Sequence, residues 1–169
     1  ILGMAKKFSE NGYDILALNY RSCSGEMNNT LKFYHHGATD DVHQVLTKYC
    51  NRYANIHLVG FSLGGNLVLK YAGETHYVKP ENIKTVVAFS VPIDLADYVK
   101  EIHKTKNRPY VVNFLKTLKQ KVRLKAEKIE GLNVKALPEL KTLIDFDNAF
   151  TAPLHGFKDA NDYYNSCGA

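Results

Sequence analysis

The chain has 169 residues, of which 45% are hydrophobic and 23% are charged, and its formal net charge is +5. This length and composition are typical of one soluble globular unit and exclude disordered, collagen-like and membrane-spanning classes of protein. The segment 99–128 holds ten Lys or Arg against two Glu, a local +8, which leaves −3 for the rest of the chain. We therefore expect any affinity for anionic surfaces to reside in that segment, and we expect no nucleic-acid partner.

The three cysteines, Cys23, Cys50 and Cys167, are odd in number, widely spaced and without a CxxC pattern. This arrangement argues against a disulfide framework or a zinc site. We predict reduced thiols and a cytoplasmic location, with association to a membrane as a further hypothesis. Because the sequence begins at Ile1 rather than at a methionine, a targeting signal cannot be judged from it.

Helical and strand-like patterns alternate through the first half of the chain. A helix-like stretch at 2–8 precedes an apolar run at 13–18, which predicts a buried strand. A helix is predicted near 39–49, with Thr39 as its N-cap and two aspartates in its first turn. Apolar runs at 56–61 and 85–89 predict two more strands, with a further helix between them. This order predicts a parallel α/β sheet with right-handed crossovers.

After Ser90 the pattern changes to helices without strands. An apolar stripe at helical spacing is formed by Val111, Phe114, Leu115, Leu118 and Val122. Basic residues occupy much of the remaining helix surface: Lys116, Lys119, Lys121, Arg123 and Lys125. We interpret this segment as an inserted helical lid. The predicted division is a core at 1–94, a lid at 95–145 and a segment returning to the core at 146–169.

The motif Gly60-Phe61-Ser62-Leu63-Gly64 lies where a predicted buried strand meets a predicted helix. The pattern G-x-S-x-G is weak alone, but this strand-to-helix context is typical of a nucleophile elbow. Glycine is expected at positions 60 and 64 because side chains there would crowd the tight turn. Ser62 is the predicted nucleophile, and the Leu63 N–H is the predicted oxyanion donor. A structural or phosphate-binding serine is the alternative.

A nucleophilic serine needs a histidine base oriented by a carboxylate. In this fold the acid and then the histidine follow the serine along the chain. The downstream histidines, His76, His103 and His155, fit that order poorly; His155 follows Asp145 and Asp147 too closely for a strand to separate them. Asp94, directly after the third predicted strand, is a weak candidate for the acid. We expect the true acid and histidine to lie outside the sequence.

Four separated motifs resemble the YheT-like α/β-hydrolases, bacterial relatives of the eukaryotic ABHD esterases and of yeast medium-chain acyl ester hydrolases. They are Asn19-Tyr20-Arg21-Ser22-Cys23-Ser24-Gly25-Glu26, Tyr34-His35-His36-Gly37, Gly60-Phe61-Ser62-Leu63-Gly64-Gly65-Asn66, and Thr151-Ala152-Pro153-Leu154-His155-Gly156-Phe157 with Asp162-Tyr163-Tyr164. The resemblance spans nearly the whole chain. It departs at Ser22, where the pattern favours glycine, and it gives the motif around His155 a structural rather than catalytic role.

The resemblance implies a partial α/β-hydrolase fold and a carboxylic-ester hydrolase that acts through an acyl-enzyme on Ser62. Its substrates would be small acyl esters or lipids of short or medium chain. Neither a metal ion nor an organic cofactor is expected. The basic lid suggests an anionic membrane surface as a partner, although a solvated helix face explains the same charges. An acyltransferase and a non-catalytic binding protein remain the alternatives.

Overall fold

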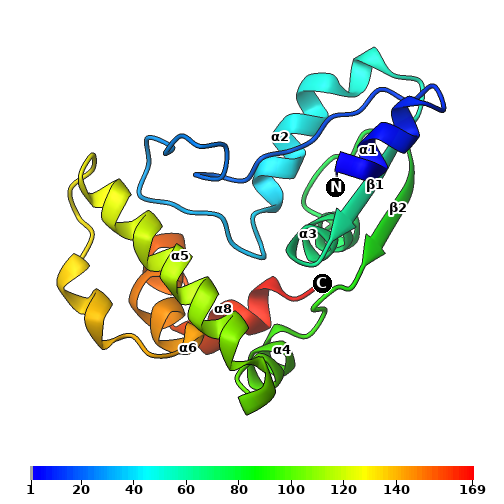
Figure 1. Cartoon of the computed structure of the whole chain (residues 1–169). Helices are drawn as coiled ribbons and strands as arrows, with labels where there is room; N and C mark the ends of the chain where they lie inside the picture. The colour runs from blue at the N-terminus through cyan, green and yellow to red at the C-terminus, as the bar shows by residue number, and fades with distance from the viewer. Residues whose placement is uncertain (1) are drawn as a thin grey trace.

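The computed structural model describes residues 2–169 and places a small α/β unit beside a bundle of helices (Figure 1). The α/β unit contains α1 (Leu2–Ser9), α2 (Thr39–Tyr49), β1 (Ile56–Phe61), α3 (Leu63–Gly73) and β2 (Ile83–Phe89). A short 3₁₀ turn, η1 (Cys50–Arg52), joins α2 to β1. The two strands pair in parallel, with Gly60 opposite Ala88 and Phe61 opposite Phe89. The predicted parallel α/β arrangement is therefore confirmed.

The predicted strand at 13–18 does not form. These residues are extended, but within residues 2–169 no backbone hydrogen bond joins them to β1 or β2. Their nearest attachment to the sheet is an edge-on contact between the rings of Tyr13 and His57, whose centroids are 5.9 Å apart. Apolar composition predicts that a segment suits a sheet, whereas a strand also needs a hydrogen-bonded neighbour.

The cap predicted for α2 is also wrong. The helix begins at Thr39, and its N-cap residue Ala38 makes no side-chain capping bond. The Thr39 hydroxyl instead lies 3.4 Å from the Tyr77 hydroxyl. The two aspartates expected in the first turn are present there, and Asp41 forms a bidentate ion pair with Arg21, at 2.5 and 2.8 Å.

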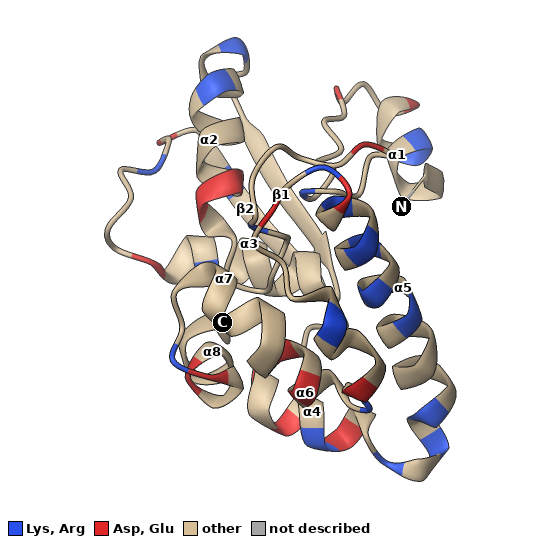
Figure 2. Ribbon diagram, turned by 90° about the vertical axis from the view of Figure 1, so that its left-hand side faces the viewer, with Lys and Arg blue, Asp and Glu red and all other residues tan. Residues whose placement is uncertain are grey.

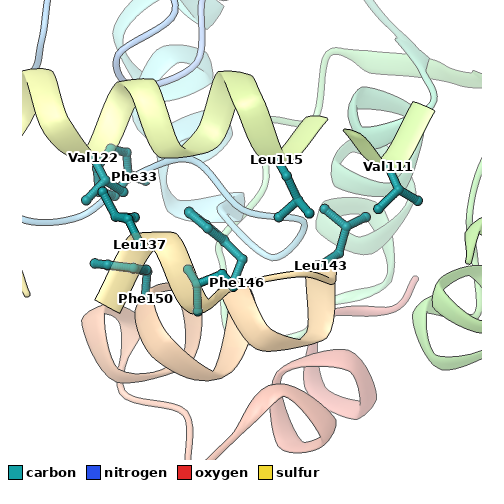
Figure 3. Close-up of a cluster of buried hydrophobic side chains, with 9 residues drawn as sticks. Phe33, Val111, Leu115, Val122, Leu137, Leu143, Phe146 and Phe150 are labelled. Carbon is teal, nitrogen blue, oxygen red and sulfur yellow. The ribbon is translucent and has the colours of Figure 1, made fainter. Parts of the chain in front are cut away.

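The second half of the chain is helical, as predicted. It consists of α4 (Leu95–Ile102), η2 (Thr105–Asn107), α5 (Arg108–Ala126), η3 (Val134–Glu139), α6 (Leu143–Phe146), the π-helical turn η4 (Asp147–Thr151), α7 (Ala152–His155) and α8 (Ala160–Cys167). Figure 3 shows α5 facing α6 and η4 across a cluster of buried side chains. The predicted apolar stripe supplies Val111, Leu115 and Val122 to this cluster. Burial of that stripe is what holds α5 in place.

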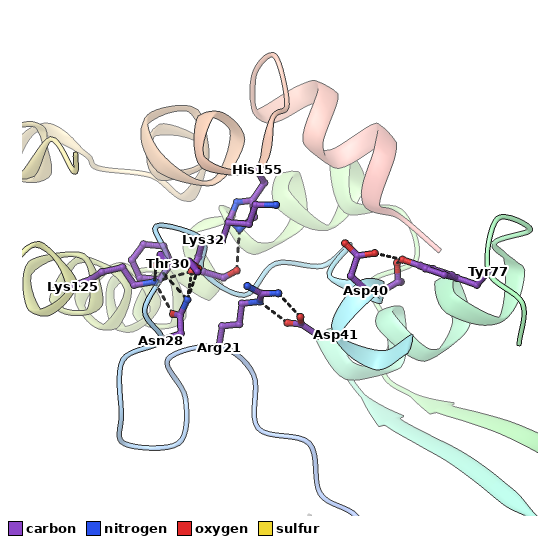
Figure 4. A network of polar contacts seen from close by, with 11 residues as sticks. Arg21, Asn28, Thr30, Lys32, Asp40, Asp41, Tyr77, Lys125 and His155 are labelled. Carbon is purple, nitrogen blue, oxygen red and sulfur yellow. Dashed lines mark hydrogen bonds and ion pairs between the residues drawn. The ribbon is translucent and has the colours of Figure 1, made fainter. Parts of the chain in front are cut away.

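Basic residues line α5 in Figure 2, but several are not free on its surface. Lys125 is fully buried and donates to Asn28 Oδ1 and to the carbonyls of Thr30 and Lys32, at 2.7–2.9 Å (Figure 4). Lys121 donates to the Ser22 carbonyl at 2.7 Å, and Lys119 donates to the Leu140 carbonyl at 2.7 Å. These three lysines therefore do not form a solvated face: loop 22–32 lies against Lys121 and Lys125, and the Leu140 carbonyl accepts from Lys119.

The buried side chain of Asn66 joins the two halves of the molecule. Its amide nitrogen donates to the carbonyls of His36 and Cys167, at 2.9 and 2.8 Å. Its carbonyl oxygen accepts a hydrogen bond from the Ala169 N–H at 3.0 Å. Because Asn66 lies one helical turn after Ser62, these bonds fix the loop around His36 and the end of α8 beside the start of α3.

Candidate functional site

Ser62 occupies a strained turn between β1 and α3. Its φ of 51° and ψ of −119° lie in a region that residues with a side chain rarely adopt. The turn is held on both sides: the Ser62 N–H donates to the Phe89 carbonyl at 2.9 Å, and its carbonyl accepts from the Asn66 N–H at 3.1 Å. Such strain persists only where the surroundings fix it, and it commonly marks a functional site.

The glycines of the motif are required for two different reasons. A Cβ atom on Gly60 would overlap the backbone carbonyl of Gly64, as the sequence predicted for the crowded turn. A Cβ atom on Gly64 would instead lie 2.5 Å from the hydroxyl oxygen of Tyr20. Position 64 is therefore restricted by a side chain from the loop after residues 13–18 and not by Gly60, which sequence spacing could not reveal.

The Leu63 N–H is the first amide of α3. Amides in the first turn of a helix have no intrahelical acceptor, and the helix dipole makes this end favourable to negative charge. Leu63 lines the same cavity as Ser62. This geometry is compatible with the predicted oxyanion role.

Ser62 opens into a cavity of about 510 Å³ between the α/β unit and the helical half. One part of the wall is apolar and includes Phe33, Leu95, Val99, Phe114, Leu118, Leu143, Phe146 and Phe150. Another part is polar and includes His36, Tyr98, Asp147, Thr151, Tyr163 and Tyr164. Lid residues and elbow residues thus meet in one cavity, although they are far apart in the sequence.

The three histidines considered from the sequence do not line this cavity. The His155 ring nitrogens lie 2.8 Å from the Thr151 carbonyl and 3.0 Å from the Phe33 carbonyl. His103 Nε2 accepts a hydrogen bond from the Leu143 N–H at 3.1 Å, and its Nδ1 donates to the Val99 carbonyl at 2.7 Å. His76 is exposed and lies 4.0 Å from Glu74. Each ring serves another contact, so none is positioned to accept the Ser62 proton.

The candidate carboxylates have different positions. Asp94 caps α4 by accepting from the Asp97 N–H at 2.9 Å, and Asp145 completes a capping box with Thr142. Asp147 alone of the three lines the cavity. Burial raises its pKa above the ordinary range, although hydrogen bonds from Thr151 and Tyr164 oppose the shift. Asp94 and Asp145 are therefore placed for helix capping.

Sequence reasoning missed a histidine in the cavity wall. The Tyr163 hydroxyl lies 2.8 Å from His36 Nδ1 and accepts from the His36 backbone N–H at 3.2 Å. A phenol hydroxyl can donate one hydrogen bond and accept two, so this contact fits either tautomer of the His36 ring. Burial lowers the pKa of His36 to about 4, so the ring is neutral at pH 7. His36 precedes Ser62 in the sequence, whereas the expected order places the catalytic histidine after the serine, so the sequence pattern did not indicate it.

Among residues 2–169, no group of three or more His, Cys, Asp or Glu side chains is placed to hold a metal ion. No described helix is both long and apolar enough to cross a membrane.

The fold, the strained serine turn and the cavity agree with the comparisons of the sequence with known families. Residues 2–123 match the model of the alpha/beta hydrolase fold family. Because the match covers most of the chain, the chain belongs to this family. The resemblance inferred from the sequence motifs is thereby confirmed.

Within the family the chain is similar to YheT-like and ABHD-type proteins. It is 29% identical to "Putative esterase YheT" of Escherichia coli over 173 residues, which cover 99% of this chain and 50% of that protein. It is 28% identical to "Monoacylglycerol lipase" of Saccharomyces cerevisiae, with 93% of this chain and 37% of that protein covered. It is 27% identical to "Phospholipase ABHD3" of Bos taurus, with 97% and 40% covered. The chain thus spans half or less of the length of these relatives. No solved structure matches it.

Proposed function

We propose that the protein hydrolyses carboxylic esters, with Ser62 as the nucleophile of a two-step acyl transfer. The observation that carries the proposal is the strained Ser62 turn opening directly into a largely apolar cavity. A hydroxyl fixed in such a turn is presented to a bound carbonyl without further reorganisation. The names of the relatives, which include an esterase and lipases, support the same class of reaction.

In the first step the Ser62 oxygen attacks the ester carbonyl and the alcohol leaves; in the second, water releases the acid. The Leu63 N–H would donate to the oxyanion of each tetrahedral intermediate. A base must accept the serine proton, and His76, His103 and His155 do not line the cavity. The proposal takes the histidine and the carboxylate from elsewhere in the protein, as the resemblance to the family implies.

The apolar part of the cavity wall fits the acyl chain of the substrate. Phe114 and Leu118 reach it from α5, while Phe146 and Phe150 reach it from α6 and η4. Hydrocarbon placed against these side chains leaves water, which favours binding by about 0.8 kcal/mol for each buried methylene group. Short and medium acyl esters, including lipids, are the proposed substrates.

The outer face of α5 supports a second part of the proposal, contact with an anionic membrane. Lys116, Arg123 and Lys128 are exposed there or just beyond the helix, and the apolar side chain of Val112 on the same helix is exposed as well. Basic and apolar side chains on one helix are typical of segments that bind at a lipid surface. Lys119, Lys121 and Lys125 do not contribute, because they bond to the protein's own carbonyls.

The test is hydrolysis of p-nitrophenyl esters by the full-length protein and by the variant Ser62→Ala. We expect the variant to lose at least about a thousandfold in kcat/KM, because the acyl-enzyme cannot form. A matched control is Ser90→Ala, which alters another serine at positive φ outside the cavity lining. Unchanged turnover in Ser62→Ala would remove Ser62 from the mechanism.

A further inference from the structure

A carboxyl group, that of Asp147, lines the same cavity as the phenylalanines proposed to hold the acyl chain. Asp147 lines the cavity and directly follows Phe146, whose ring packs on that of Phe150 with centroids 5.3 Å apart (Figure 3). Both phenylalanines line the cavity as well. A plain hydrocarbon chain in this part of the cavity would cover the carboxyl without offering it a hydrogen bond, which is unfavourable.

The hydrogen bonds to Asp147 leave part of its capacity unused. The Thr151 hydroxyl donates to Oδ1 and the Tyr164 hydroxyl donates to Oδ2, each at 2.6 Å. A carboxylate has about four acceptor positions, so two remain. Both donors also line the cavity, which fixes the carboxyl at its wall.

No cation neutralises this carboxyl within residues 2–169. Asp147 takes part in none of the ion pairs found there. His103 is close enough to favour the charged carboxylate, but its ring accepts the Leu143 N–H and donates to the Val99 carbonyl, which is the pattern of a neutral imidazole. Among residues 2–169, the side-chain donors to Asp147 are Thr151 and Tyr164, so its remaining acceptor positions have no partner there.

A hydroxyl is the ligand group that fits this carboxyl in both of its protonation states. The ionised carboxylate needs a hydrogen-bond donor, whereas the protonated carboxyl needs an acceptor for its own proton. A hydroxyl supplies both, while an ether or carbonyl oxygen only accepts and an ammonium group only donates. Burial raises the pKa of Asp147, which favours a ligand group that fits the protonated carboxyl as well as the ionised one.

We propose that Asp147, held by Thr151 and Tyr164, is a specificity-determining residue that binds a substrate hydroxyl, so that the Ser62 cavity favours esters of hydroxylated acyl chains. The hydroxyl is assigned to the acyl chain because Asp147 lies between Phe146 and Phe150 in the sequence, and both phenylalanines line the cavity proposed to hold that chain. The inference rests on the proposed function and narrows its substrate class.

The experiment compares matched ester pairs on the full-length protein. Each pair is a saturated acyl ester and the same ester with one hydroxyl at successive positions of the chain; a second series carries the hydroxyl on the alcohol part. We expect kcat/KM to favour one hydroxylated acyl ester over its plain partner by about tenfold. Asp147→Leu should abolish or invert this preference, whereas Asp97→Asn, an exposed carboxylate change outside the cavity lining, should preserve it.

Labelling of Ser62 by a fluorophosphonate separates the two possible failures. If wild-type Ser62 is labelled but no hydroxylated acyl ester is preferred, the inference about Asp147 is wrong and the proposed function stands. A preference confined to the alcohol series, or one retained in Asp147→Leu, also overturns it. If wild-type Ser62 is not labelled, the proposed function fails and the inference fails with it. The wild-type comparison decides the matter even if Asp147→Leu does not fold.

Discussion

The Tyr20 hydroxyl lies close to position 64, which predicts that Tyr20→Phe will relieve the destabilisation caused by Gly64→Ala. In Gly64→Ala the new Cβ atom would lie 2.5 Å from the Tyr20 hydroxyl oxygen but 3.9 Å from the ring carbon that bears it. The first distance is a severe overlap, while the second is an ordinary van der Waals contact. Removing the hydroxyl with Tyr20→Phe should therefore remove most of the strain.

Overpacking of this kind destabilises a protein by about 1–3 kcal/mol, and we expect Gly64→Ala alone to fall in that range. Alanine in a helix is favoured over glycine by about 0.5–1 kcal/mol. In the Tyr20→Phe background, Gly64→Ala should accordingly be neutral or stabilising. The coupling between the two substitutions should be about 1–3 kcal/mol and favourable to the double variant.

The assay is urea unfolding of wild type, both single variants and the double variant, together with the rate of fluorophosphonate labelling at Ser62. Gly60→Ala is the matched control, because its Cβ atom would overlap the Gly64 backbone, which Tyr20→Phe cannot relieve. A double variant no more stable than Gly64→Ala, or an equal rescue of Gly60→Ala by Tyr20→Phe, would refute this reasoning.

Four other predictions concern Lys125, the exposed basic residues on or just beyond α5, and Asn66. Lys125→Met should cost about 1–3 kcal/mol of unfolding free energy, because three oxygen acceptors lose a hydrogen bond from the ammonium group while keeping one from Ser22 or Asn28, whereas the exposed Lys116→Met should change it by less than about 0.5 kcal/mol. Burial lowers the pKa of Lys125 to about 8, so the folded protein loses this proton at a lower pH than the unfolded chain does. The unfolding free energy measured by chemical denaturation should therefore rise between about pH 8 and the ordinary lysine pKa. This rise should be absent in Lys125→Met. Reversing Lys116, Arg123 and Lys128 to Glu should weaken binding to anionic vesicles in sedimentation assays at low salt, and wild-type binding that does not fall with salt would contradict the proposed contact. Asn66→Ala should lower the unfolding free energy by about 2–4 kcal/mol in urea titrations, since it leaves buried backbone groups of His36 and Cys167 without a partner; a loss under about 0.5 kcal/mol would contradict that role.

The elements around Ser62 were predictable because their signals are local. The apolar residues of β1, the glycines of the turn and the helical spacing of α3 are local signals, and the structure places these elements at the predicted residues, although within β1 only Gly60 is buried. The stripe that contains Val111 and Leu115 was predictable for the same reason, because helical periodicity indicates which face is buried.

The interactions between distant segments were not predictable from one sequence. Periodicity assigned Lys125 to a polar face, but the carbonyls of loop 28–32 surround its amine, and nothing local to Lys125 encodes that loop. His36 contacts Tyr163 across 127 residues of sequence. The same holds for the run at 13–18: its apolar residues can be read from the sequence, but whether a neighbouring strand pairs with it cannot.

Mass spectrometry of the acyl-enzyme tests the central claim most directly. The full-length protein is mixed with a p-nitrophenyl ester, quenched in acid at early times and digested. We predict an acyl group on the peptide that contains Ser62, formed at the rate of the p-nitrophenol burst and absent from Ser62→Ala. Steady hydrolysis with no adduct at Ser62, or with the adduct on another residue, would contradict the account.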